Sequence, residues 1–295
     1  MLRRLFKTIR LHFWRFAASG WLPRRWMVRN LPPEPFRQAR TGPLRIEVVS
    51  HCWKYSHLLV YQLSSLVLDP PEHAEITMTV FYASEDVATR DLLDFIGGHV
   101  VPGVRWNWQE LPPPYLFRRS IGRNRAALQS DADWVWFTDC DVVFVSGCLD
   151  NLVEALQGRS DPLVFPRAER VTTLLAEDDP LLRAGSQWSL LTMDTQRFTE
   201  RELSRATGPV QITHGDVARA VGYCRDIPAL QESVPRFAKC YEDRVFRWLL
   251  GTQGLPLDFP GVYRIRHAEK GRYSGGMEAR LRRGMRKAQE RRASG

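Results

Sequence analysis

Two aspartates, Asp139 and Asp141, stand two residues apart at the end of the apolar run 133–138. In extended backbone, side chains i and i+2 point to the same side, so both carboxylates can face one ligand. Two such charges repel each other unless a cation lies near them. Hard divalent cations bind carboxylate oxygens and diphosphates together, so the pair suits a metal-bound nucleoside diphosphate. The alternative for so short a motif is a solvated turn, which the apolar flanks disfavour.

The segments that must position these aspartates alternate between strand and helix patterns. Apolar and β-branched runs predict strands at 44–50, 75–82, 104–108 and 133–138. Helical spacing of apolar residues predicts helices at 57–68, 87–96, 120–129 and 150–156. This alternation predicts an α/β fold with a parallel sheet flanked by helices. Ligands bind beyond the carboxyl ends of such strands, so the loops after Ser50, Tyr82 and Thr138 should meet in one crevice.

Three ordered segments resemble family 2 glycosyltransferases with the GT-A fold. In that family an Arg-Asn helix start precedes the strand and the Asp-x-Asp motif, a glycine-bearing acceptor segment follows, and a Glu-Asp motif opens a later helix. The matching segments here are 120–141, 213–223 and 240–250. The resemblance spans roughly residues 44 to 270. It implies a GT-A (Rossmann-like) fold with a mixed, mostly parallel central sheet.

The resemblance also implies roles for the acidic residues. Asp139 would contact the ribose and diphosphate side of the donor, and Asp141 would bind the metal, Mn²⁺ or Mg²⁺. Asp139 and His267 would complete the metal site. Asp243 is the favoured catalytic base and Glu242 the second candidate, since the attacking hydroxyl needs a carboxylate to take its proton. The alternatives are a solvated helix start for the Glu-Asp pair and an exposed loop histidine for His267.

Further residues fall where the family contacts the nucleotide. The loop after the first strand, with Ser50 and Tyr55, is expected at the nucleobase, and Asp86 is expected to bind the base. The family commonly has a paired Asp-Asp there, which this chain lacks, so the base identity stays open. Arg123 or Arg125 is expected at the diphosphate because guanidinium forks suit phosphate oxygens. Their alternative interpretation is solvated helix-face charge.

The implied activity is an inverting transfer of a sugar from a nucleoside diphosphate sugar, with a UDP-sugar expected. The acceptor would be a hydroxyl of a glycan or of a lipid-linked envelope precursor. Two alternative functions remain open. A nucleotidyltransferase of sugar metabolism would also need an acidic metal site. A non-enzymatic protein could use its basic ends to bind a membrane or a polyanion.

The basic charge lies at the two ends of the chain. Residues 1–29 hold eight basic and no acidic side chains, and residues 278–295 hold seven basic and two acidic ones. The net charge of +9 therefore belongs to the ends, and the stretch between them is mildly acidic. We expect a basic arm and Pro-rich linker (1–43), a catalytic domain (44–277) and a basic tail (278–295).

Within the arm, apolar residues recur at helical spacing over 1–20, with tryptophans nearby and basic residues mainly opposite. Such a helix suits an anionic membrane surface, and its alternative is packing on the protein itself. No apolar run is long enough to span a bilayer. The five cysteines are odd in number and form no CxxC pair, which favours a reducing compartment. We therefore expect a cytoplasmic protein, peripheral on the inner face of the membrane, with no nucleic-acid partner.

Overall fold

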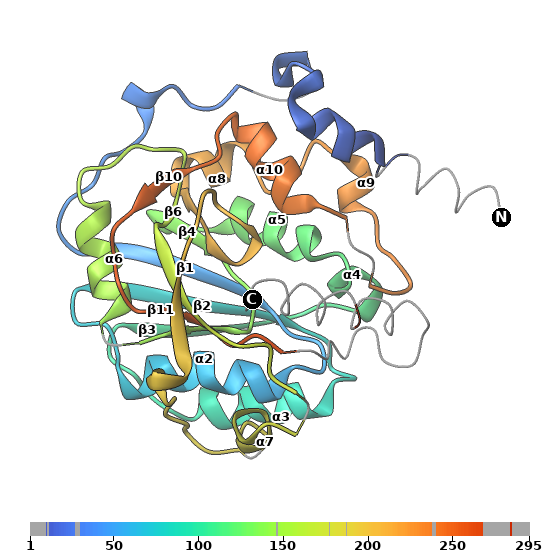
Figure 1. Cartoon of the computed structure of the whole chain (residues 1–295). Coiled ribbons are helices and arrows are strands. Elements are labelled where there is room, and N and C mark those ends of the chain that lie inside the picture. Colours follow the sequence, from blue (N-terminus) through green and yellow to red (C-terminus); the bar gives the residue numbers. More distant parts are fainter. Residues whose placement is uncertain are drawn as a thin grey trace.

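The structure is a computed structural model that describes residues 10, 12–26, 30–145, 147–176, 178–186, 188–237, 240–267 and 284. A seven-stranded sheet forms its centre (Figure 1), in the order β10-β6-β9-β4-β1-β2-β3. Its strands are β1 (Leu44–His51), β2 (Ala74–Tyr82), β3 (Val104–Glu110), β4 (Trp134–Phe137), β6 (Leu163–Pro166), β9 (Gln211–His214) and β10 (Leu255–Leu257). Strand β9 runs antiparallel to both neighbours, and the remaining pairs are parallel. The expected α/β fold with a mixed, mostly parallel sheet is confirmed.

The elements predicted between residues 44 and 156 are all present, with ends that differ by one or two residues from the sequence patterns. In Figure 1, one set of helices lies below the sheet, and the other set lies above it. The lower set is α2 (Ser56–Leu68), α3 (Val87–Gly97) and α7 (Pro180–Ala184). The upper set is α5 (Arg119–Gln129), α8 (Gly215–Val221), α9 (Pro228–Gln231) and α10 (Glu242–Leu250). Helices α4 (Pro113–Leu116) and α6 (Cys148–Leu156) lie to the sides.

A second, four-stranded sheet has the order β5-β11-β7-β8. It consists of β5 (Val142–Phe144), β7 (Ala168–Thr172), β8 (Phe198–Glu202) and β11 (Val262–Arg264). Strand β5 follows β4 after four residues, so the chain passes from one sheet to the other at 138–141. The predicted Asp-x-Asp motif therefore lies at the junction of the two sheets.

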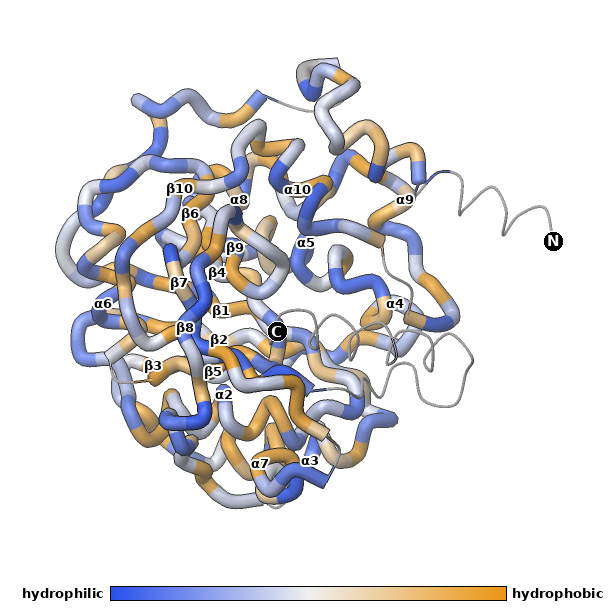
Figure 2. Tube along the Cα trace, viewed as in Figure 1, coloured by the Kyte–Doolittle hydropathy of each residue, from blue (hydrophilic) through white to orange (hydrophobic). Residues whose placement is uncertain are grey.

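The core is formed by buried strands and by the helix faces that cover them. Strand β4 is buried along its whole length, and Trp136 and Phe137 have no exposed surface. Figure 2 shows hydrophobic residues concentrated along the strands and on the helix sides beside them. All five cysteines are buried, and no disulfide joins any two of them. Because β4 is held on both sides by strands, the residues that follow it have a fixed position.

The N-terminal arm packs on the globule. Residues 12–16 are helical and continue into η1 (Ala17–Trp21), whose left-handed Gly20 interrupts the predicted helix. Residues 1–9 of that predicted helix lie outside the described part of the chain, as does the tail except Gly284. The Pro-rich stretch is tied to the body rather than loose, since Gln38 N donates to Asp216 (2.8 Å) and Gly42 N donates to Gln157 (2.7 Å). It contains η3 (Glu34–Phe36), and η2 (Arg24–Trp26) and η1 precede it. Among the described residues, no helix has the length and apolar character needed to cross a membrane.

Candidate active site

The Asp-x-Asp turn is held from both sheets. Thr138 N donates to Val49 O in β1 at 3.0 Å, and Ile265 N, just after β11, donates to Asp141 O at 2.9 Å. A buried side chain supports the turn from below, because Gln62 Nε2 of α2 donates to Val142 O (2.8 Å) and to Asp139 O (3.2 Å). Asp139 and Asp141 are both partly exposed. The turn is therefore fixed in place while Asp139 and Asp141 each keep part of their surface exposed.

The turn lies at the point where the strand order of the large sheet reverses. The chain builds β1, β2 and β3 outward in one direction and then returns to place β4 on the other side of β1. The loops after β1 and β4 consequently leave in opposite directions, and in open α/β sheets ligands bind in the crevice between such loops. The strand order therefore predicts that a ligand would bind between His51 and Asp139.

Two arginines of α5 converge on Asp139. Arg119 and Arg123 are four residues apart and so share one face of the helix. Arg119 forms a short ion pair with Asp139, and Arg123 Nη2 lies 3.2 Å from Asp139 Oδ1. Arg123 also donates to Thr138 O and to Gly208 O, both at 3.0 Å. Arg125, which the sequence analysis placed at the diphosphate, is exposed on another face of α5 because it is only two residues from Arg123. Arg119 takes the place expected of Arg125.

Glycine at position 122 is what lets α5 approach this closely. A Cβ there would lie 2.2 Å from His51 Nε2 and 3.0 Å from the Phe81 ring. His51 and Phe81 stack at 4.9 Å between ring centroids, at the carboxyl ends of β1 and β2. Because Gly122 has no side chain, the face of α5 that carries the arginines can pack directly against the ends of β1 and β2.

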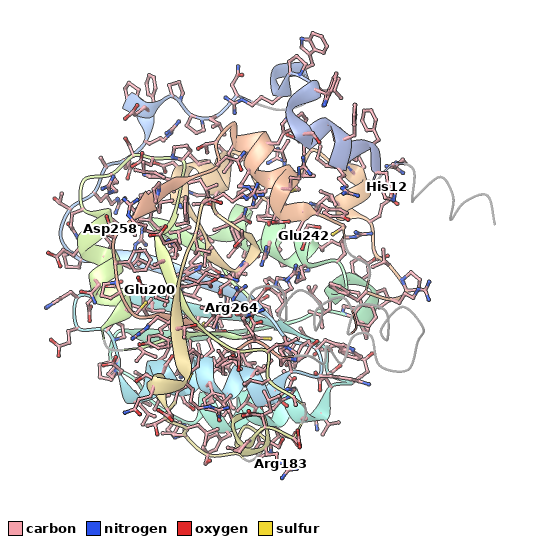
Figure 3. The ribbon with its side chains drawn as sticks, viewed as in Figure 1. His12, Arg183, Glu200, Glu242, Asp258 and Arg264 are labelled. Atoms are coloured by element: carbon pink, nitrogen blue, oxygen red, sulfur yellow. The ribbon has the colours of Figure 1, made fainter. Side chains whose placement is uncertain are left out.

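The Glu-Asp motif opens α10, as predicted, and its two carboxylates differ in surroundings. Glu242 is buried, and its Oε1 lies 2.9 Å from Arg119 Nη2, so Arg119 bridges Glu242 and Asp139. Figure 3 labels Glu242 at the start of α10, beside α5. Burial raises the pKa of the Glu242 carboxyl, but the charges of Arg119 and Arg123 outweigh burial and lower this pKa to about 2. Asp243 has a side chain that is 33% exposed and lies 3.3 Å from Arg247 Nη1. Asp243 is therefore the accessible carboxylate of the motif.

The residues expected at the nucleobase lie in two loops that are joined to each other. The Asp86 carboxylate accepts a short hydrogen bond from Lys54 N and another from Thr89 Oγ1 (2.7 Å), which links the loops after β1 and β2. Tyr55 is buried at the start of α2. Ser50 is also fully buried, and its hydroxyl donates to Gln62 Oε1 at 2.6 Å. Ser50 thus supports the Asp-x-Asp turn through Gln62 instead of facing the crevice.

A small pocket lies between the loop after β1 and the start of α5. Arg119 contributes to its wall, so the pocket adjoins the Asp139 ion pair. The remaining lining residues are His51, Cys52, Trp53, Leu116, Phe117 and Phe237. Its volume is only about 10 Å³, which is room for about one water molecule, so the pocket as it stands is too small for a nucleobase.

His267 comes near the turn through the small sheet. It lies two residues after Ile265, which is bonded to Asp141, and its ring is 5.3 Å from the Tyr55 ring. However, the described residues contain no group of three or more His, Cys, Asp or Glu side chains close enough to hold a metal. The predicted set of Asp139, Asp141 and His267 is therefore not assembled as a three-ligand cage.

The glycine-bearing segment that resembles an acceptor segment lies at the opposite end of β4. His214 pairs with Trp134, the first residue of β4, and Gly215 N donates to Asp133 O at 2.7 Å. Strand β9 is antiparallel to β4, which carries residues 213–216 away from Asp139. The segment that does reach the site is 206–210, where Gly208 contacts Arg123 and lies beside Asp243.

Sequence reasoning missed three supporting residues, namely Gln62, Gly208 and Tyr223. Tyr223 accepts a hydrogen bond from Arg123 Nη1 (2.9 Å) and donates one to Gln211 (2.7 Å). No local motif marks Gln62 or Gly208, and the segment 213–223 gave Tyr223 no role of its own, because each of the three acts through a partner far away in the chain. Arg119 had a signal, since it precedes Arg123 by four residues and lies directly before the predicted helix 120–129.

Comparisons with known proteins give structural likenesses only. No protein-family profile matches the sequence, and no curated protein is significantly similar to it. The fold is similar to mannosyltransferase PcManGT from Pyrobaculum calidifontis in complex with GDP-Man and Mn²⁺, at 15% identity and a TM-score of 0.45, over 96% of this chain and 74% of that one. It is also similar to residues 1–349 of TarS from S. aureus in complex with UDP-GlcNAc, at 11% identity and a TM-score of 0.47, over 82% and 66%. Because both TM-scores lie below 0.5, neither likeness decides the activity of this chain.

Proposed function

We propose that this chain is a metal-dependent, inverting glycosyltransferase of the family 2-like, GT-A type. It would transfer a sugar from a nucleoside diphosphate sugar, with a UDP-sugar as first choice, to a hydroxyl of a glycan or lipid-linked acceptor. The observation that carries the proposal is the convergence of Asp139, Asp141, Arg119 and the start of α10 at the strand-order switch. A donor diphosphate, a metal and a base each find a matching group there.

The metal is Mn²⁺ or Mg²⁺ in this proposal. The donor set fits such an ion, because these hard cations are commonly held by one or two carboxylates together with substrate phosphates rather than by a protein cage. The lack of a three-ligand cluster among the described residues agrees with a site completed by the donor. Asp141 is the preferred ligand because the resemblance assigns the metal to it, and Asp139 is engaged by Arg119 and Arg123. When bound, the metal would neutralise charge on the departing diphosphate.

Arg119 is the side chain best placed to exchange partners. Its guanidinium spans Asp139 and Glu242, and its side chain is 18% exposed. Phosphate oxygens bind guanidinium forks as carboxylates do, so a donor diphosphate would compete with Asp139 for this fork. Arg123 is completely buried and bonded to two carbonyl oxygens, so its role is to hold the turn in place.

Asp243 is the proposed catalytic base. The acceptor hydroxyl must lose a proton as the bond to the sugar forms, and a carboxylate within reach can take it. Glu242 is ill suited, because it is buried, paired with Arg119 and a weak base at a pKa of about 2. Its proposed role is to hold Arg119 in position.

Calorimetric titration of the full chain with UDP, in Mn²⁺ and in EDTA, tests the donor site. We expect binding that needs the metal and that Asp141→Ala abolishes. The Asp131→Ala variant, at a 71% exposed side chain, is the matched control and should bind as wild type does. Absence of metal-dependent binding to UDP, GDP, dTDP and CMP alike would refute the donor site. With a bound UDP-sugar, release of UDP supports transfer, and release of pyrophosphate would indicate nucleotidyl transfer instead.

A further inference from the structure

One side of the arm packs against α10, and the other side faces away from the protein. Ala17 is fully buried, and the Trp14 and Trp248 rings lie 6.2 Å apart between centroids. Trp248 Nε1 donates to Leu22 O at 3.1 Å, and Arg244 Nη2 donates to Ser19 Oγ at 2.8 Å. These contacts confirm that the arm packs on the protein, and they fix which side of it faces outward.

The outward side carries four large rings. Phe13, Phe16, Trp21 and Trp26 are exposed by 45%, 54%, 74% and 67%. Phe16 and Trp21 stack on each other at 5.7 Å between centroids, so they form one continuous apolar surface. Figure 3 shows the side chains of this segment projecting away from the body of the molecule. Single exposed apolar residues are ordinary, but four rings in fourteen or so residues of sequence call for a partner.

The charge of the segment indicates which partner. Residues 1–29 hold eight basic side chains and no acidic one, so an anionic surface would meet no repulsion from the arm. Three of the described basic groups are used within the protein, since Arg10 pairs with Glu232 (3.0 Å), Arg15 lies over the Tyr241 ring (4.6 Å) and Arg24 Nη1 donates to Leu249 O (3.0 Å). Arg3, Arg4 and Lys7 precede them in the sequence. Exposed Trp and Phe next to basic residues match the headgroup region of an anionic bilayer, where rings enter the acyl boundary and cations stay at the phosphates.

We propose that the outward side of the arm, formed by Phe13, Phe16, Trp21 and Trp26, docks on an anionic membrane surface. The docking is independent of the proposed transferase activity. It also places the start of α10 near the bilayer, because Arg15 stacks over Tyr241, the residue before Glu242. If the proposed function holds, an acceptor attached to lipid would lie on the side of the protein where Asp243 is found.

Sedimentation of the full chain with protein-free vesicles tests the docking. We expect binding to vesicles of phosphatidylglycerol and phosphatidylcholine, and weak binding to phosphatidylcholine alone. The triple variant Phe16→Ser, Trp21→Ser, Trp26→Ser should bind at least about tenfold more weakly, since it loses the inserting rings. Trp188→Ser removes a 37% exposed tryptophan beyond the end of α7 and is the matched control that should bind as wild type does.

Equal binding of the triple variant and wild type, or no binding of wild type to anionic vesicles, would overturn the proposal. Circular dichroism and the UDP titration establish that the triple variant is folded. Should it fail to fold, the single variant Trp21→Ser serves, with quenching by brominated acyl chains as the measurement. Quenching should fall relative to wild type, and unchanged quenching would overturn the proposal. The vesicle assays contain no nucleotide, so their failure leaves the donor site untouched.

Discussion

Strand β4 has an Asp-x-Asp sequence at each end, and the two ends differ in what surrounds them. Asp131 and Asp133 precede the strand, whereas Asp139 and Asp141 follow it. At the first end, the Asp133 carboxylate accepts from Arg45 N (2.8 Å) and lies 3.2 Å from Arg40, and Asp131 is 71% exposed beside Arg45. At the second end, Asp139 is held by two arginines of one helix, one of them fully buried.

This difference shows that the role of an Asp-x-Asp motif depends on whether it precedes or follows the strand. The first pair lies at the amino ends of the parallel strands β1 and β4. There the two carboxylates bond to a backbone N–H group and to solvated arginines. The second pair lies at the carboxyl ends, where helix starts and loops leave a crevice. The same three-residue pattern is thus structural at one end and a candidate site at the other.

The largest expected effect is at the base. Asp243→Asn should lower kcat by about 10²- to 10⁴-fold with little change in UDP affinity, because the acceptor loses its proton acceptor. Steady-state kinetics together with UDP titration measure both quantities. Glu242→Gln should instead weaken UDP binding, since it releases Arg119. If Asp243→Asn retained full kcat, Asp243 would not be the base.

Matched substitutions at the two ends of β4 test the comparison directly. Asp139→Asn should weaken metal-dependent UDP binding by about 10²-fold, comparable to the loss of one strong electrostatic contact. Asp133→Asn should leave UDP binding unchanged and lower the free energy of unfolding by about 1–3 kcal/mol, because the buried Asp133 side chain loses its charge-assisted hydrogen bond to Arg45 N. Calorimetry and urea unfolding of both variants are the measurements. Equal effects on UDP binding would erase the distinction between the two ends.

Two glycines provide a second pair across the same strand. A Cβ on Gly122 would meet His51 at the site end, and a Cβ on Gly215 would lie 2.1 Å from Ala132 O at the other end. Both alanine variants should lower the free energy of unfolding by at least about 1–3 kcal/mol, because neither neighbour can move freely. Only Gly122→Ala should also reduce UDP affinity, since it displaces α5. A Gly122→Ala variant with wild-type affinity would show that α5 need not press on β1.

The ion pair of Glu242 with Arg119 should make the free energy of unfolding depend on pH. Its folded pKa of about 2 lies below the ordinary value of 4.5, so the pair stabilises the fold above pH 4.5. This stabilisation should be lost as the pH falls from about 4.5 towards 2. Urea unfolding of wild type and Glu242→Gln between pH 7 and pH 3 measures it. The gap between the two proteins should narrow below pH 4.5, and a constant gap would contradict the ion-pair assignment.

The smallest effect belongs to the exposed acid of the first pair. Asp131→Ala should change the free energy of unfolding by less than about 0.5 kcal/mol, because solvated ion pairs contribute little. Thermal unfolding at low and high salt is sufficient to detect a larger change. A loss well above that value would mean that Asp131 is part of a cooperative network with Arg45.

The alternating strands and helices of the first half could be predicted from the sequence because their signal is local. The run 133–138 and the spacing of leucines in 57–68 each determine an element without help from distant residues. The small sheet could not be predicted, since β5 and β11 have three residues each and pair across more than a hundred residues. The antiparallel direction of β9 could not be predicted either, because it also depends on pairing between distant residues. It places residues 213–216 at the end of β4 opposite to Asp139. The ion pair of Arg119 with Asp139 depended on both the helix phase and the approach that Gly122 permits.

Helix α10 joins the proposed catalytic base to the arm that is proposed to dock on the membrane. It has nine residues, so at about 1.5 Å per residue it is roughly 13 Å long. Its first turn carries Asp243, and Trp248 near its end holds the arm. The arm contacts both ends of this helix, through Arg15 over Tyr241 and through Trp248. If the proposed docking and transferase activity hold, this would keep Asp243 at a nearly constant distance from the bilayer and favour acceptors whose spacer between lipid and hydroxyl matches that distance.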